Sequence, residues 1–215
     1  MTEIYELPPE RLGRWLERWA ERHGPVARTE HGERTATFRG AGGEVECEPP
    51  FPPLAPFAAE GFEPGPLLEH VRRERTVGVL LVRLGGHATG VFEGRRLVAS
   101  KVGSRLVHAR HRKGGSSQKR FARRREGQAR EALAAAADNA ARILLPRAGE
   151  LEAVVLGGDR RALGTVLEDP RLAPLAALAV ARVLAVPDPR LAVLRAAPDR
   201  FLATTVRPGG SRPAA

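Results

Sequence analysis

The chain has 215 residues and a formal net charge of +10, because 35 Lys and Arg stand against 25 Asp and Glu. Its 42 % hydrophobic and 28 % charged residues are ordinary for a globular protein and argue against disorder throughout the chain. The single cysteine, Cys47, excludes a disulfide within the chain and a metal site with several thiolates. No apolar run reaches the roughly 18 residues of a membrane span, and the acidic N-terminus lacks the apolar core of a signal peptide. We therefore expect a cytoplasmic protein with no membrane partner.

Residues 8–23 predict an amphipathic helix. Two prolines suit its first turn, and Leu12, Trp15, Leu16 and Trp19 recur at helical spacing. Both tryptophans of the chain lie on this apolar stripe, which favours a place in the hydrophobic core over stacking on bases.

The helix opens a predicted small α+β domain over residues 1–66. Three short alternating runs, separated by glycine-bearing turns, predict an antiparallel meander: residues 26–31, 35–39 and 44–48. The next segment, residues 49–66, contains seven prolines, which cannot donate hydrogen bonds inside a sheet. We therefore expect an extended connector there, docked on the surface by its large apolar side chains, and a domain boundary at residue 66.

Residues 67–206 predict a second domain, of the mixed α/β class, whose ribonuclease-H-like sheet has flanking helices. After a helical turn, three apolar runs at hairpin spacing predict a meander of antiparallel strands: residues 76–84, 87–94 and 96–109. Residues 118–145, closed by Pro146, predict a helix roughly 42 Å long at about 1.5 Å per residue. Later segments predict two strands and three helices: strands 151–158 and 181–186, and helices 160–168, 171–181 and 191–197. The Gly- and Pro-containing tail, residues 207–215, is expected to be disordered.

The net charge is concentrated in one window, residues 101–130. This window holds eleven basic residues and one acid, Glu126, so its net charge of +10 equals that of the whole chain. The other 185 residues carry 24 basic and 24 acidic side chains. A neutral body with one basic stretch indicates contact with a polyanion, and we expect that polyanion to be nucleic acid.

The pattern argues against a metal-dependent nuclease. Only Glu93, Asp138 and Asp159 would be placed to hold metal ions, and the first strand of the second domain carries no carboxylate. Asp159 is interpreted instead as the N-cap of the helix that follows it. His108 and His111 have a spacing that zinc sites use, but no nearby Cys, Asp or Glu completes a ligand set. We therefore expect neither a metal nor a cofactor.

The segment KGGSSQKRFARRRE, Lys113–Glu126, is the best candidate for chemistry. We expect a mobile loop over residues 110–117, followed by a helix whose N-terminus Ser116 or Ser117 caps. Two glycines let the backbone approach a ligand closely, while serine and glutamine supply neutral donors and acceptors. Gln118 cannot serve as a general acid or base near neutral pH, but its side chain can orient a water and its N–H can stabilise an oxyanion. The segment predicts an arm with a phosphate-binding helix and a neutral tip.

The stretch VGVLLVRLGG…ATGVFEG…KVGSRLVHARHRKGGSSQKRFARRRE…EAVVLGGDRR resembles the middle, peptide-releasing domain of the archaeal and eukaryotic termination factors. In that domain a Gly-Gly-Gln loop precedes an Arg-rich helix. Here Ser116 and Ser117 stand between the glycine pair and Gln118. This longer loop, in a chain without stop-codon-reading domains, resembles the actinobacterial branch of the Vms-one-like release factors. The resemblance covers residues 70–206.

The resemblance implies a release-factor middle-domain fold and hydrolysis of the ester between nascent peptide and tRNA on stalled large ribosomal subunits, without codon reading. Gln118 matches the essential glutamine, Gly114 and Gly115 match the glycine pair, and Ser116 and Ser117 belong to the same catalytic loop. The basic residues of the loop and helix would contact ribosomal RNA: Arg110, Arg112, Lys113, Lys119, Arg120, Arg123, Arg124 and Arg125. The implied partners are the 23S rRNA and peptidyl-tRNA, and we expect a monomer.

Two other functions remain open. A factor that binds ribosomal RNA without catalysis would show the same salt-sensitive binding but would release no peptide. A metal-independent nuclease that cuts tRNA would need His108 or His111 as its acid or base.

Overall fold

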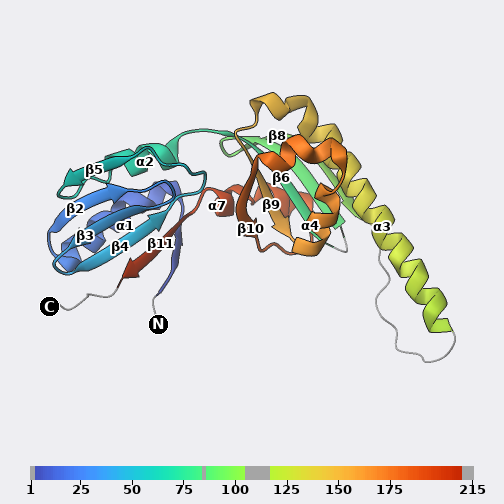
Figure 1. The fold of residues 1–215 in the computed structure, drawn as a ribbon, viewed down its shortest axis with the longest axis horizontal. Coiled ribbons are helices and arrows are strands. Elements are labelled where there is room, and N and C mark those ends of the chain that lie inside the picture. The colour runs from blue at the N-terminus through green and yellow to red at the C-terminus, as the bar shows by residue number, and fades with distance from the viewer. Residues whose placement is uncertain (1–2, 84–85, 105–116, 210–215) are drawn as a thin grey trace. The chain divides into compact units, whose positions relative to one another are not determined.

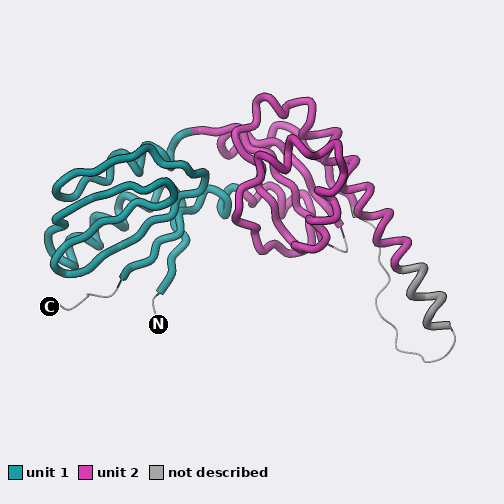
Figure 2. Tube along the Cα trace, viewed as in Figure 1, with its two compact units in different colours: residues 1–73, 198–215 teal, residues 74–197 magenta. Residues whose placement is uncertain are grey.

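The structure is a computed structural model that describes the backbone of residues 3–83, 86–104 and 117–209. Side chains are described over the same ranges, except residues 104–125. The chain divides into two compact units (Figure 2). Unit 1 contains Met1–Arg73 and Pro198–Ala215, and unit 2 contains Glu74–Ala197.

Unit 1 is built on a six-stranded antiparallel sheet. Its strands follow one another across the sheet in the order β1 (Tyr5–Leu7), β11 (Thr204–Gly209), β4 (Gly43–Glu48), β3 (Ala36–Gly40), β2 (Val26–His31) and β5 (Phe57–Glu60). The meander β2–β3–β4 is the one that the three alternating runs predict. Alternation places Ala36, Phe38, Val45 and Cys47 in the core, because successive side chains point to opposite faces of a strand.

Two helices cover one face of this sheet, α1 (Pro9–His23) and α2 (Gly65–Arg72). Helix α1 confirms the predicted amphipathic helix, and its side chains Leu12, Leu16 and Trp19 are buried in the same core as the sheet. Trp15 is only half-buried and packs its ring 5.4 Å from that of Tyr5. The predicted core role therefore holds in full for Trp19 and in part for Trp15.

Unit 1 differs from its prediction in three places. The connector 49–66 contains strand β5, which lies at the sheet edge in the proline-free stretch after Pro56. Helix α2 belongs to unit 1, so the division falls after Arg73 instead of residue 66. The expected disordered tail, residues 207–215, includes the last three residues of β11, while residues 210–215 lie outside the described chain.

Unit 2 is built on a five-stranded mixed sheet with the strand order β10–β9–β6–β7–β8. Its strands are β6 (Thr76–Arg83), β7 (Gly86–Glu93), β8 (Arg96–Ser104), β9 (Ala153–Gly158) and β10 (Ala179–Leu184). The meander β6–β7–β8 is antiparallel, and β9 and β10 add parallel strands on the other side of β6. This is the predicted ribonuclease-H-like order. The central strand β6 has six consecutive buried residues, as expected where both faces of a strand are covered.

The helical elements of unit 2 are α3 (Ser117–Leu144), α4 (Arg160–Leu167), α5 (Ala173–Ala177) and α6 (Leu191–Arg195), with short 3₁₀ segments η1 (Leu145–Glu150) and η2 (Pro170–Leu172). Helices α3 and α4 share one hydrophobic core with β6 and β9 on one sheet face (Figure 1). Asp159 caps α4 as predicted, because its Oδ1 accepts a hydrogen bond from the Ala162 N–H at 2.8 Å. The short helix α7 (Pro198–Phe201) belongs to unit 1 and has no counterpart among the predicted elements.

Candidate functional site

Helix α3 is packed against unit 2 by its C-terminal half. Ala136, Ala137, Ala140 and Leu144 are buried among sheet and α4 side chains, whereas no residue over 126–135 is buried. The N-terminal half of the helix extends past the sheet (Figure 1). The long helix therefore consists of a packed base and a projecting half.

Polar contacts fix the base of α3 at two neighbouring positions. Asn139 Nδ2 lies 2.6 Å from Nε2 of His87 on β7, and Arg142 Nη2 donates a hydrogen bond to Asn139 Oδ1 at 2.7 Å. Beside Asn139, Asp138 forms an ion pair with Arg171 of η2 at 2.7 Å. These contacts join the helix to both the sheet and the segment after α4, and they resist rotation of α3 about its axis.

The contact between His87 and Asn139 defines the state of the imidazole. Because Asn139 Oδ1 accepts from Arg142, its Nδ2 donates, so His87 Nε2 must be the unprotonated nitrogen. Burial lowers the pKa of His87, which also favours the neutral ring. The ring lies over Gly103 on β8, where an added Cβ would overlap the imidazole. His87 thus links β7, β8 and α3 in one packed group.

A cavity of about 220 Å³ lies beside this group, between the sheet and α3. Its lining includes Gly86 and His87 of β7, Lys101 and Gly103 of β8, and Leu133 and Asn139 of α3. It borders the end of β8, from which the chain continues into residues 105–116. The cavity therefore marks the base of the predicted arm.

The predicted catalytic residues fall at the edge of the described chain. Gly114, Gly115 and Ser116 lie outside the described residues. Ser117 and Gln118 are the first two residues of α3, and their side chains are not described. Because α3 begins at Ser117, the Gln118 N–H is one of the four at a helix start that have no acceptor within the helix.

The predicted RNA-binding residues divide in the same way. Arg110, Arg112 and Lys113 lie outside the described residues, as do His108 and His111. The others stand in the first turns of α3, again without described side chains: Lys119, Arg120, Arg123, Arg124 and Arg125. The helical backbone over these positions agrees with the predicted basic helix.

The three carboxylates considered for a metal site are held by separate partners. Glu93 Oε1 accepts from Arg147 at 2.9 Å, Asp138 pairs with Arg171, and Asp159 caps α4. Within residues 3–83, 86–103 and 126–209, no group of three or more His, Cys, Asp or Glu is arranged to hold a metal ion.

Sequence reasoning did not single out His87, Asn139 or Gly103. One signal was available for Asn139, because it is a polar residue at helical spacing from Ala136 and Ile143 on an otherwise apolar face. Nothing in the sequence pairs it with His87, which lies 52 positions earlier.

Residues 75–207 match the model of the Actinobacteria/chloroflexi VLRF1 release factor family, which is more than half of the chain. The chain belongs to this family. The match confirms the resemblance to the actinobacterial Vms-one-like release factors, and it includes nearly all of unit 2 together with α7 and the first part of β11, up to Arg207, in unit 1.

Other comparisons found one similar relative and several similar solved structures. The chain is 29 % identical over 113 residues to peptide chain release factor subunit 1 of Archaeoglobus fulgidus. The matched residues make up 52 % of this chain and 28 % of that relative. The crystal structure of the archaeal translation termination factor aRF1 is similar with a TM-score of 0.45 and 15 % identity, over 87 % of this chain and 68 % of that one. The crystal structure of Archaeoglobus fulgidus Pelota is similar with a TM-score of 0.32 and 14 % identity. That match covers 94 % of this chain and 64 % of Pelota. The chain thus spans less than a third of its archaeal relative.

No helix of the described chain is long and apolar enough to cross a membrane.

Proposed function

We propose that this protein hydrolyses the ester of peptidyl-tRNA on stalled large ribosomal subunits and so releases the nascent peptide without reading a codon. The observation that carries the proposal is the position of Gln118 in the first turn of a long helix whose buried side chains, among those described over residues 126–144, all lie in its far half. Membership of a release-factor family supports the reaction class. The ribosomal substrate implies action in the cytoplasm.

The packed base of α3 supplies the rigidity that such an arm needs. Small side chains let the helix lie close to the sheet, and the contacts of Asp138 and Asn139 prevent it from turning. About 21 residues separate Asn139 from Gln118, which is roughly 30 Å along a helix. A fixed base therefore sets where the first turn of α3 lies.

The proposed chemistry is the addition of water to the ester carbonyl. The water oxygen bonds to the acyl carbon, the bond from that carbon to the ribose oxygen breaks, and the proton lost by water ends on the ribose hydroxyl. The Gln118 side chain would orient the water, and a backbone N–H at the helix start would stabilise the oxyanion. Gly114 and Gly115 would let the loop approach the ester, with Ser116 and Ser117 extending it.

The basic residues of the arm would supply affinity for RNA. Guanidinium groups pair with phosphates in two-pronged hydrogen bonds, and their attraction does not depend on base sequence. We assign this role to the predicted set: Arg110, Arg112, Lys113, Lys119, Arg120, Arg123, Arg124 and Arg125. Their partner would be the 23S rRNA around the bound peptidyl-tRNA, and the protein would act as a monomer.

The proposal is tested with purified large subunits that carry radiolabelled peptidyl-tRNA. The parent protein should release labelled peptide, and Gln118→Ala should release it at least about 100-fold more slowly, the cost of removing one aligned polar group. Gln128→Ala is the matched control, because it removes the same side chain from the same helix and should leave the rate unchanged.

Two further measurements separate the alternatives. Sedimentation with subunits should show that Gln118→Ala still binds, because the basic residues remain. Gel analysis should show the tRNA intact after release, since a nuclease would shorten it. The proposal is wrong if the parent protein binds subunits and releases no peptide, and the role of Gln118 is wrong if its variant matches the parent rate.

A further inference from the structure

The exposed face of α1, in unit 1, carries a row of arginines. Arg11, Arg14, Arg18 and Arg22 are all exposed, and at 3.6 residues per turn they fall within a sector of about 80° around the helix. They line a groove of about 650 Å³ together with Trp15 and two glutamates. The row lies opposite the helix face that packs into the core.

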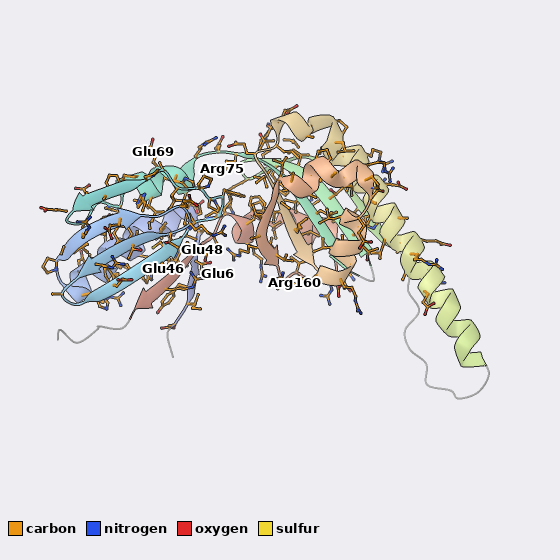
Figure 3. All side chains as sticks on the ribbon, in the orientation of Figure 1. Glu6, Glu46, Glu48, Glu69, Arg75 and Arg160 are labelled. Atoms are coloured by element: carbon orange, nitrogen blue, oxygen red, sulfur yellow. The ribbon has the colours of Figure 1, made fainter. Side chains whose placement is uncertain are left out.

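These arginines differ from those on the uncovered face of the unit 1 sheet. There, the guanidinium of Arg28 pairs with Glu30 at 2.6 Å, and Arg39 pairs with both Glu30 and Glu44. Arg207 contacts Glu48 at 2.9 Å. Figure 3 shows Glu48 with its neighbour Glu46 on β4, and Glu46 is a second partner of Arg207 at 3.3 Å. The sheet face therefore neutralises its own arginines.

The row on α1 is not neutralised in this way. Among the described side chains, Arg11, Arg14 and Arg18 form no ion pair, and Arg22 donates its Nε–H to the Arg18 carbonyl at 3.1 Å. Glutamates also lie on α1, but by helical geometry they occupy one border of the row: Glu10, Glu17 and Glu21. The guanidiniums thus form an uninterrupted stripe with donors left for a partner.

An aromatic edge adjoins the stripe. Trp15 lines the same groove, and its half-buried ring contacts that of Tyr5. Guanidinium groups beside a partly exposed indole suit a sugar–phosphate backbone, because cations bind the phosphates and the ring offers an apolar surface to ribose or base. An apolar partner would leave these donors unsatisfied.

We propose that the α1 stripe is a second RNA-binding surface, which contacts the sugar–phosphate backbone independently of the basic arm on α3. Charge complementarity favours a polyanion as the partner, because α1 presents guanidinium donors in a fixed row. The acids of the sheet face do not compete for these donors, because they are already paired with other arginines. The surface adds affinity without base specificity. It requires no ester and no catalytic glutamine, so it goes beyond the proposed peptide release.

The test uses the full chain and a fluorescein-labelled RNA hairpin of 20 base pairs. Its background is a chain with Arg123→Gln, Arg124→Gln and Arg125→Gln, which weakens the arm. The test variant adds Arg11→Gln, Arg14→Gln and Arg18→Gln. The control adds Arg28→Gln, Arg34→Gln and Arg39→Gln instead, which removes the same charge from the sheet face and from the β2–β3 turn, where Arg34 lies 4.0 Å from Glu48.

The α1 variant should bind the hairpin at least about tenfold more weakly than the background. The slope of log K against log salt concentration should become less negative by about 2. The sheet-face control should change the affinity for the hairpin less than about threefold. It removes the same net charge but no contact, so only the long-range electrostatic attraction is reduced. Far-UV circular dichroism of both variants should match the parent, because the substituted side chains are exposed.

Three outcomes would overturn the proposal. The first is an α1 variant that binds as tightly as the background, and the second is a control that loses as much affinity as the α1 variant. The third uses large subunits digested with ribonuclease: binding that survives digestion and still depends on Arg11, Arg14 and Arg18 would identify an acidic protein as the partner. Because the hairpin contains no peptide ester, none of these results depends on the release assay.

Discussion

Helices α1 and α3 both present arginines, but they are held in different ways. Helix α1 is packed along its length, from Pro9 to Trp19, by large side chains that enter the unit 1 core. Over residues 126–144, the part of helix α3 whose side chains are described, the buried residues begin at Ala136, and most of them are alanines. A helix held throughout offers its charge as a fixed surface, whereas one held by its base can carry charge and a polar tip away from the domain.

The largest expected effect follows from removing a core side chain of α1. Leu16 is fully buried, so Leu16→Ala should lower the free energy of unfolding of unit 1 by about 2–5 kcal/mol. Leu133→Ala, at a half-buried position of α3, should cost unit 2 about 1 kcal/mol or less, because fewer contacts are lost there.

Urea titrations can follow the two units separately. Both tryptophans of the chain lie on α1, so their fluorescence reports on unit 1, while far-UV circular dichroism reports on both units. Equal losses from the two substitutions would contradict the contrast between the helices.

The next effect concerns the base of α3. Gly103→Ala should destabilise unit 2 by about 1–3 kcal/mol, because the new methyl group would collide with the His87 ring that contacts Asn139. Gly127→Ala is the matched control in the projecting half, where an added Cβ meets nothing within 4 Å. It should stabilise the helix by up to about 1 kcal/mol, since alanine favours helix over glycine.

A double variant identifies the cause of the Gly103 effect. Combining Gly103→Ala with His87→Ala should cost less than the sum of the two single losses, because removing the ring frees the space that the methyl group needs. Additive losses in urea titrations would show that the imidazole is not the obstacle.

The smallest expected effect is one of pH. Burial holds the pKa of His87 below its ordinary value, so under acidic conditions the unfolded chain binds a proton that the folded chain does not. Stability should therefore be greatest above the ordinary histidine pKa of about 6.5 and fall as the pH decreases below it. Burial lowers the pKa of His31 in unit 1 in the same direction.

Substitution separates the two histidines. His87→Gln should reduce the acid-side loss of unit 2, measured by circular dichroism between pH 7.5 and pH 5.5, and leave the tryptophan signal of unit 1 unchanged. An unaltered pH dependence in unit 2 would assign the loss to other groups.

The sequence predicts most of unit 2 because its signals are local. Apolar runs with hairpin spacing define β6, β7 and β8, and Asp159 marks the start of α4. Local signals fail for Asn139, whose partner His87 is 52 positions away and is brought near only by the folded sheet. The roles assigned to Gln118 and the basic residues rest on the chemistry and charge of the loop and helix together with the family resemblance, and they remain predictions.

Unit 1 was harder to predict because its sheet is assembled from distant segments. β1 has only three residues, and the strand character of β1 and β11 comes from pairing across about 200 positions, as between Tyr5 and Val206. β5 is a four-residue strand without proline inside a proline-rich segment, so the composition of that segment concealed it.

The place of β11 has a consequence for how the protein is made. Of the described strands, β1 pairs with β11 alone, and β11 is also the neighbour that covers the edge of β4. Ribosomes synthesise residues 74–197 before β11, so the segment of unit 2 can fold while two strand edges that β11 will pair, one of β1 and one of β4, are still open. Synthesis that stops before Thr204 would leave those edges exposed to strands of other chains, a recognised route to aggregation.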